Sequence, residues 1–199
     1  PSAMDFLKLF RKKKEGARPC RIVFEKENTE NTYITLEDGM KPRIDRDDCL
    51  TDQEYQALTA RWEEMLALAE GILWHNYLDP DSDDLLSEED SFPEIRYLTG
   101  RYYVGDVSYG CSYRDQDGRA YHIKEGRLRH KHHNGKEWLE EWQELDSPEI
   151  TRRCRILLSL SLTGNENGTE EDYMGLDLIA ELDTPDSPIE FEILSHDVI

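Results

Sequence analysis

Residues 156–162 read ILLSLSL, residues 174–182 read MGLDLIAEL and residues 189–193 read IEFEI. In each segment apolar side chains recur at every second position, which is typical of a β-strand with one buried face. Acids stand between them, namely Asp177, Glu181, Glu190 and Glu192. Turn-forming sequences at 165–168 and 184–188 separate the segments. We therefore expect an antiparallel C-terminal meander that displays these four carboxylates on its solvent face.

The same region carries a large share of the charge. From Ile156 to Ile199 there are eleven Asp or Glu residues and no Lys or Arg, in a chain whose formal net charge is −20. A rigid acidic surface repels nucleic acid and anionic lipid and attracts a basic surface. The pattern therefore predicts a basic protein as the partner and argues against nucleic acid.

Length and composition favour one domain. At 199 residues and 37% hydrophobic residues the chain can bury a substantial core. We expect residues 1–16 to be an expression remnant followed by a flexible basic N-terminus, and residues 17–199 to form a single α+β domain with an acidic loop at 79–92. No apolar run is long enough to be a transmembrane segment and no secretory signal is recognisable, so the expected location is cytoplasmic.

The four cysteines give a further expectation about the chemistry of the chain. They lie far apart with no C-x-x-C pair, and four in a chain of this length are too few for a disulfide scaffold. We expect reduced and mostly buried thiols at all four positions: Cys20, Cys49, Cys111 and Cys154.

The clearest helix signal begins at Thr51. Thr51 and Glu54 have capping-box spacing, and Leu50 and Tyr55 stand at hydrophobic-staple positions. An apolar stripe at helical spacing continues from there until Asp79-Pro80. It predicts one long helix to about Tyr77, with the core positions Tyr55, Leu58, Trp62, Met65, Leu66, Ala69, Ile72 and Leu73.

The remaining segments favour strands. We expect a hairpin from 20–25 and 32–36, strands at 102–104, 107–113 and 119–123, and a basic strand or loop at 127–133. Residues 138–145, WLEEWQEL, fit a second short helix, although strand alternation is also satisfied. The predicted fold class is α+β: an antiparallel sheet of hairpins and a C-terminal meander, packed against one long helix and, as an option, a second short helix.

Two clusters of possible ligands suggest metal binding, but each lacks residues that a complete metal site needs. Asp79, Asp81 and Asp83 hold positions 1, 3 and 5 of an EF-hand-like loop, but Asp84 stands where the loop needs Gly and Asp90 where it needs Glu. A solvated loop that contacts a partner is therefore favoured over a calcium site.

The second cluster is histidine-rich. His130 and His132 would share one face of a strand and supply half of a zinc or nickel site, but no further ligand completes a familiar spacing. Arg129 and Lys131 stand beside them and oppose a cation. A solvated hairpin that titrates near neutral pH is therefore favoured.

Residues 119–136 form a basic island, with six Lys or Arg against the single acid Glu125. Nucleic-acid binding is one interpretation, but the overall negative charge opposes the approach of a polyanion. We expect the island to pair with acidic segments of the same chain or of a second copy.

Signs of catalysis are weak. Cys111, between Gly110 and Ser112, could be a nucleophile, but no catalytic signature surrounds it and a buried structural cysteine is favoured. No phosphate-binding or metalloprotease motif occurs in the sequence, so no catalytic residue and no cofactor are predicted.

These patterns favour an acidic inhibitor that neutralises a basic partner. We therefore expect a protein of the bacterial toxin-immunity kind, with a nuclease toxin as one candidate target. Two alternatives remain: a metal-dependent enzyme or sensor that uses His130, His132 or Asp79, and a structural subunit or adaptor. The expected partner contacts are Asp177, Glu181, Glu190 and Glu192 of the sheet and Asp81, Asp83 and Asp84 of the loop.

Overall fold

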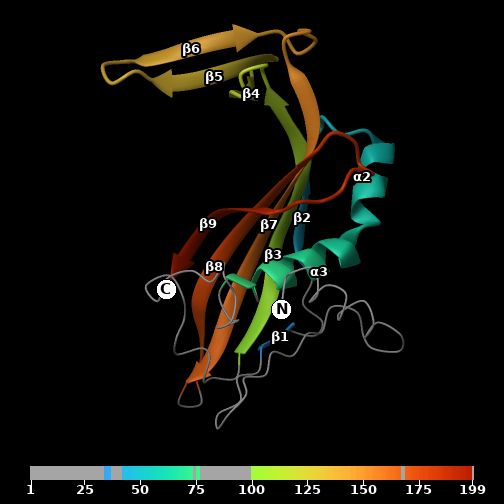
Figure 1. Ribbon diagram of the computed structural model, residues 1–199, viewed down its shortest axis with the longest axis vertical. Coiled ribbons are helices and arrows are strands. Elements are labelled where there is room, and N and C mark those ends of the chain that lie inside the picture. The colour runs from blue at the N-terminus through green and yellow to red at the C-terminus, as the bar shows by residue number, and fades with distance from the viewer. Residues whose placement is uncertain (1–33, 37–41, 74, 77–99, 167–168, 199) are drawn as a thin grey trace.

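The computed structural model describes residues 34–36, 42–73, 75–76, 100–166 and 169–198 (Figure 1). Within them, two helices accompany one nine-stranded, mainly antiparallel sheet, so the predicted α+β class is confirmed. The helices are α2 (Asp52–Thr59) and α3 (Trp62–Leu73). The strands are β1 (Ile34–Leu36), β2 (Arg43–Arg46), β3 (Gly100–Arg114), β4 (Ala120–Lys124), β5 (Arg127–His133), β6 (Trp138–Gln143), β7 (Thr151–Glu166), β8 (Thr169–Leu182) and β9 (Glu192–Val198).

The long strand β3 is the centre of the sheet, whose order is β6-β5-β4-β3-β7-β8-β9. The short strands β1 and β2 pair with β3 in parallel, whereas β7, β8 and β9 follow it as an antiparallel meander. The predicted C-terminal antiparallel meander is therefore confirmed, but its third strand begins at Glu192, so Ile189, Glu190 and Phe191 of the predicted segment 189–193 precede the strand. The predicted strands 102–104 and 107–113 are one strand, interrupted only by an irregularity in the pairing between Val104 and Asp106.

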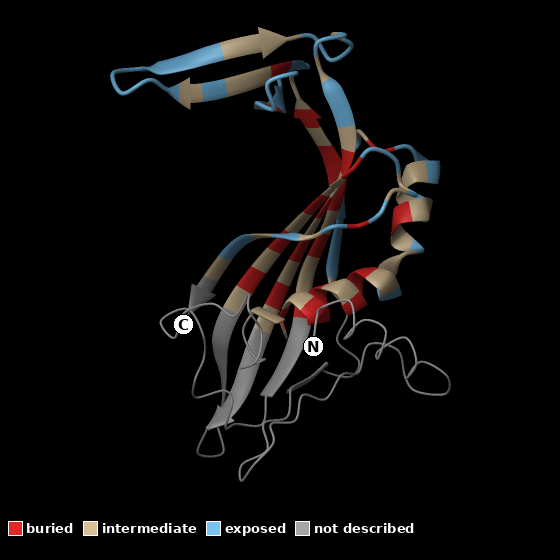
Figure 2. Ribbon diagram, viewed as in Figure 1, coloured by how far each residue is buried: buried red, intermediate tan, exposed pale blue. Residues whose placement is uncertain are grey.

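One face of β3, β7 and β8 forms the core. Tyr109, Ile156 and Ala180 are cross-strand neighbours and are all buried, as are Leu158 and Leu178. The helices lie along this face and add Leu58, Met65, Leu66, Ala69 and Leu73 to the same cluster. In Figure 2 the buried residues accordingly lie along α3 and the central strands. Burial of each large aliphatic side chain here contributes about 1.5–3 kcal/mol.

The single long helix that the periodicity predicts is wrong, because the structure divides it at Ala60 and Arg61. The capping box is present: Glu54 N–H donates to Thr51 Oγ1 (3.1 Å), and Thr51 N–H donates to Glu54 Oε1 (3.0 Å). The guanidinium of Arg61 donates to the carbonyls of Pro185 (2.7 Å) and Ser187 (2.6 Å) in the β8–β9 connection. These contacts hold the chain at the break, and nothing near residue 61 in the sequence indicates them. The predicted end near Tyr77 lies outside the described residues.

The optional short helix at 138–145 is also wrong, because residues 138–143 form strand β6. β6 pairs with β5, and β5 follows β4 through the two residues Glu125 and Gly126, whose φ values are 53° and 75°. Positive φ at both positions is the signature of a type I′ hairpin turn. Once β5 is a strand, the turn at Asn134-Gly135 brings residues 138–143 back alongside it. β4, β5 and β6 form an arm that projects from the body of the sheet (Figure 1).

Two of the cysteines correct the expectation of reduced thiols. Cys49 and Cys111 form a disulfide with a Cα–Cα distance of 6.3 Å, whereas Cys154 is the expected buried free thiol. The connection between β2 and α2 folds against β3, where Asp47 N–H donates to the carbonyl of Tyr109 (2.9 Å), and so brings Cys49 to Cys111.

Cys20, the strand at 20–25 with its turn, and the acidic loop at 79–92 lie outside the described residues. Among the helices that the structure describes, none is long and apolar enough to cross a membrane.

Candidate binding pocket between the arm and the body

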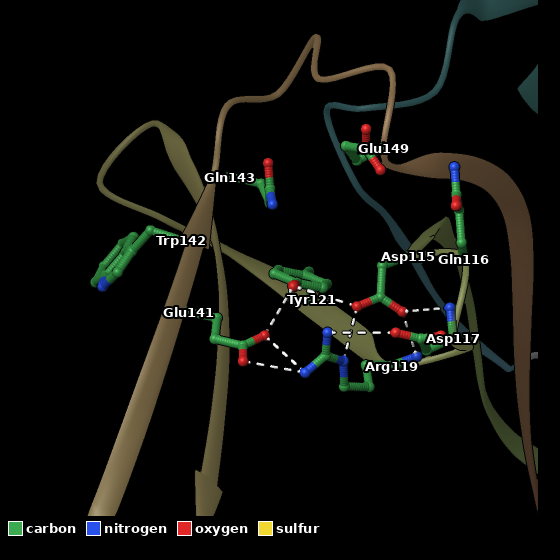
Figure 3. A pocket seen from close by; sticks show the side chains of 9 residues that line it. All are labelled: Asp115, Gln116, Asp117, Arg119, Tyr121, Glu141, Trp142, Gln143 and Glu149. Carbon is green, nitrogen blue, oxygen red and sulfur yellow. Dashed lines mark hydrogen bonds and ion pairs between the residues drawn. The ribbon is translucent and has the colours of Figure 1, made fainter.

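A polar pocket of about 410 Å³ lies where the arm leaves the body of the sheet (Figure 3). The β3–β4 turn, the start of β4, the end of β6 and the β6–β7 connection surround it. Its lining residues are Asp115, Gln116, Asp117, Arg119, Tyr121, Glu141, Trp142, Gln143 and Glu149.

The β3–β4 turn holds the pocket's first carboxylate in a fixed place. Asp115 Oδ1 accepts the backbone N–H groups of Asp117 (3.0 Å) and Arg119 (2.9 Å). Gly118, at φ 81°, allows the chain to reverse, and its N–H donates to the carbonyl of Asp115 (3.1 Å). The carboxylate therefore needs little ordering when a ligand binds.

Arg119 joins this turn to the arm. Its Nε donates to Asp115 Oδ2 (2.8 Å), and its Nη1 lies 2.9 Å from Glu141 Oε2 on β6. The hydroxyl of the buried Tyr121 lies between the same two carboxylates, 3.4 Å from Asp115 Oδ2 and 3.3 Å from Glu141 Oε2. Side chains from the turn, β4 and β6 thus form one hydrogen-bonded frame (Figure 3).

The protonation states within the frame follow from its contacts. Burial works to raise the pKa of Asp115, but hydrogen bonds from the backbone and guanidinium of Arg119 lower it overall. Burial, followed by the charges of Asp115 and Glu141, raises the pKa of Tyr121. At neutral pH the carboxyl of Asp115 is therefore ionised and the phenol of Tyr121 is neutral.

The pocket keeps an excess of negative charge. Four carboxylates line it, those of Asp115, Asp117, Glu141 and Glu149, whereas Arg119 is its one cationic lining residue. Arg119 approaches the first three of these carboxylates, although Asp117 stays 3.6 Å away and 80% exposed. No cation in the described part of the chain pairs with the exposed Glu149. The pocket can therefore accept hydrogen bonds from an ammonium or guanidinium group.

Three of the six cations of the basic island pair with acids in the described part of the chain. Arg127 pairs with Glu144 (3.1 Å) and Arg129 with Glu140 (3.5 Å), and both guanidinium groups lie over the ring of Trp142. Arg119 pairs with Glu141, as described above. The structure thus confirms that cations of the island pair with acids of the same chain.

The sheet acids predicted as partner contacts have different environments. Glu181 is only 15% exposed and receives Arg114 in a bidentate pair (2.7 and 2.9 Å), with Arg153 3.7 Å away. Arg114 is the main cause of the lowered pKa of Glu181, and burial opposes it. Arg114 on β3 and Arg153 on β7 lie on the same sheet face as Glu181 on β8. Side-chain alternation along each strand places these three positions on one face, so this alternation is the sequence signal that could have revealed the two arginines.

The other sheet acids do not join Glu181 in one uncompensated patch. Asp177 accepts hydrogen bonds from the hydroxyl groups of Ser159 (2.6 Å) and Ser195 (2.9 Å). Glu190 and Glu192 are exposed, and the charge of Glu192 helps to raise the pKa of Arg114. The loop residues Asp79, Asp81, Asp83 and Asp84 lie outside the described residues.

The histidine cluster is a stacked pair on β5. The rings of His130 and His132 lie 5.2 Å apart, and His130 Nδ1 is 2.8 Å from the carbonyl oxygen of Ala120. Across the described ranges, no group of three or more His, Cys, Asp or Glu side chains is arranged to hold a metal ion.

Comparisons of the chain with known proteins found no match. No family model, no curated protein and no solved structure matches the chain significantly.

Proposed function

We propose that this protein is a non-catalytic inhibitor that neutralises a basic protein partner, in the manner of a bacterial toxin-immunity protein. A lysine or arginine side chain of the partner enters the pocket between the β3–β4 turn and β6. The observation that carries the proposal is the pair of incompletely compensated carboxylates, Asp117 and Glu149, beside a frame already ordered by Arg119.

The frame favours tight binding of a cation. Hydrogen bonds to charged groups contribute about 1.5–3 kcal/mol each. The backbone of the turn that carries Asp117 is already ordered by its hydrogen bonds to Asp115, which avoids part of the entropic cost of binding. The net charge of −20 adds long-range attraction that accelerates encounter with a basic protein.

The pocket replaces the acidic sheet as the principal contact in this proposal. Glu181 already has two arginine neighbours, so a partner would have to compete with Arg114 for it. Glu190 and Glu192 are exposed and contribute attraction at the periphery. Their role is thus to assist encounter, whereas the pocket provides specific contacts.

Two double variants with the same change in net charge test the proposal. Asp117→Asn with Glu149→Gln removes charge from the pocket, and Glu190→Gln with Glu192→Gln removes the same charge from the sheet. The probe is an arginine-rich peptide, with affinity measured by calorimetry at low and at about 150 mM salt. We expect the pocket variant to bind at least about tenfold more weakly and the sheet variant to change by less than about threefold.

Two results would contradict this proposal. Equal losses in the two variants would mean that only total charge matters, and unchanged binding in the pocket variant would exclude the pocket. Thermal unfolding of both variants serves as the folding control.

The immunity role needs a separate biological measurement. A toxin gene next to the gene for this protein would support it, and co-expression should then protect growth. Protection by the wild type that is lost in the pocket variant would support the mechanism, whereas an adjacent operon of metabolic or secretion genes would favour the adaptor alternative.

A further inference from the structure

Three cysteines meet on the core face of the sheet. Cys111 of β3 is bonded to Cys49 and stands directly opposite Cys154 of β7. Cys111 and Cys154 are 7% and 1% exposed, so both side chains point into the core. Directly opposite residues in an antiparallel pair have Cα atoms about 4.5–5.5 Å apart, within the range of about 4.4–6.8 Å that a disulfide spans. Backbone spacing thus permits a disulfide between Cys111 and Cys154 without movement of either strand.

We propose that Cys111 exchanges its disulfide partner from Cys49 to Cys154, so that the protein has two disulfide isomers. The thiolate of Cys154 attacks Sγ of Cys111, the Cys111–Cys154 bond forms and the Cys49–Cys111 bond breaks. Cys49 leaves as a thiolate and takes up the proton that Cys154 lost. Thiol–disulfide exchange of this kind needs no oxidant or reductant, because the numbers of disulfides and thiols do not change.

The neighbours of Cys154 control how fast this exchange occurs. Its thiol lies 3.6 Å from Glu54 Oε2, and Arg152 donates both to Glu54 (2.8 Å) and to the carbonyl of Cys49 (2.6 Å). Burial, followed by the charge of Glu54, raises the pKa of Cys154 to about 11. The thiol is therefore protonated at neutral pH, and the exchange rate should rise about tenfold per pH unit as the thiolate fraction increases.

The disulfide exchange changes which of the thiols is accessible to solvent. A cavity of about 520 Å³ is lined by both Cys49 and Cys111, and Cys49 is half-buried beside it. A buried thiol at Cys154 is thus converted into an accessible thiol at Cys49. The connection between β2 and α2 loses its covalent bond to β3, although Asp47 keeps its contacts with Tyr109 (2.9 Å) and Arg155 (3.0 Å).

The test follows the position of the free thiol. In a Cys20→Ser background only the three described cysteines remain. The oxidised protein is incubated between pH 7 and pH 9 without added thiol, quenched with acid, blocked with N-ethylmaleimide and digested with Glu-C protease at acidic pH. Cleavage after glutamate places Cys49, Cys111 and Cys154 in the separate peptides 38–54, 95–125 and 150–166. We expect a Cys111–Cys154 linkage with labelled Cys49 that forms faster at higher pH.

Two variants keep the test decisive. Cys49→Ser in the same background should form the Cys111–Cys154 disulfide with oxidised glutathione, which tests the geometry directly. Cys154→Ser should show only the Cys49–Cys111 linkage and no label. A Cys49→Ser protein that is folded by circular dichroism but keeps two free thiols would overturn the proposal, as would exclusive Cys49–Cys111 linkage in the parent at every pH.

Discussion

Replacing Glu54 with Gln should weaken the attachment of α2 to the sheet by removing one charge. Glu54 accepts two hydrogen bonds from the guanidinium of Arg152 on β7, at 2.8 and 3.0 Å. These bonds are the main cause of the fall in its pKa from 4.5 to about 2, and burial opposes them. Gln keeps the side-chain acceptor that the capping box with Thr51 needs. The variant therefore isolates the ion pair from the helix cap.

The size of the effect follows from linkage. A fall from 4.5 to about 2 corresponds to roughly 3 kcal/mol at about 1.36 kcal/mol per pKa unit. Glu54 and Arg152 are 20% and 35% exposed, so solvent screening reduces the expected loss to about 1–2 kcal/mol at pH 7. Because the pKa is lowered in the folded state, the stabilisation is present above pH 4.5 and is lost as the pH falls through 2.

Urea unfolding at pH 7, 4, 3 and 2 provides the measurement. The wild type should exceed Glu54→Gln in free energy of unfolding at pH 7, and the two should converge near pH 2. Asp52→Asn is the matched control in the same helical turn: Asp52 also pairs with an arginine, Arg46 (2.7 Å), but is 86% exposed, so loss of this surface pair should cost only about 0.5 kcal/mol. A difference that is independent of pH, or one no larger than the control, would refute the assigned role of the Glu54–Arg152 pair.

Two further predictions concern the core. Leu158→Ala should lower the free energy of unfolding by about 2–5 kcal/mol, because Leu158 is fully buried in β7, whereas Leu194→Ala, at a position that is 58% exposed, should change it by less than about 0.5 kcal/mol in the same denaturation assay. Tyr109→Phe should resist alkaline unfolding better than the wild type: burial raises the pKa of Tyr109 to about 12, so the stabilisation by its neutral phenol is present below pH 10 and is lost as the pH rises to 12. Thermal unfolding between pH 8 and pH 12 measures this, and parallel losses in the two proteins would contradict it.

Local patterns in the sequence predicted the features that depend on near neighbours. Strand alternation correctly placed Leu158 and Leu178 in the core, because successive side chains of a strand point to opposite faces. The capping box at Thr51 and Glu54 was equally predictable, since both partners lie within one helical turn. The β3–β4 turn that supports the pocket also has a recognisable sequence, Asp115-Gln116-Asp117-Gly118.

The pocket itself could not be predicted from those patterns. Tyr121 and Glu141 are 20 residues apart and meet only because β6 is a strand that folds back along β5. Glu149 reaches the same pocket from the β6–β7 connection. No local motif indicates that these side chains converge. If residues 138–145 had formed a helix, Glu141 would not lie on a strand beside β5.

The sequence by itself thus determined most of the positions that face the core, and the large negative charge of the chain. The tertiary structure alone decided how the charges and thiols are paired. Glu181 and Arg114 are 67 residues apart and Cys49 and Cys111 are 62 apart, yet each pair is brought into contact by strand register and by the folding of the β2–α2 connection. Hydrophobic periodicity is set by local backbone geometry, whereas these partners depend on which strand lies beside which.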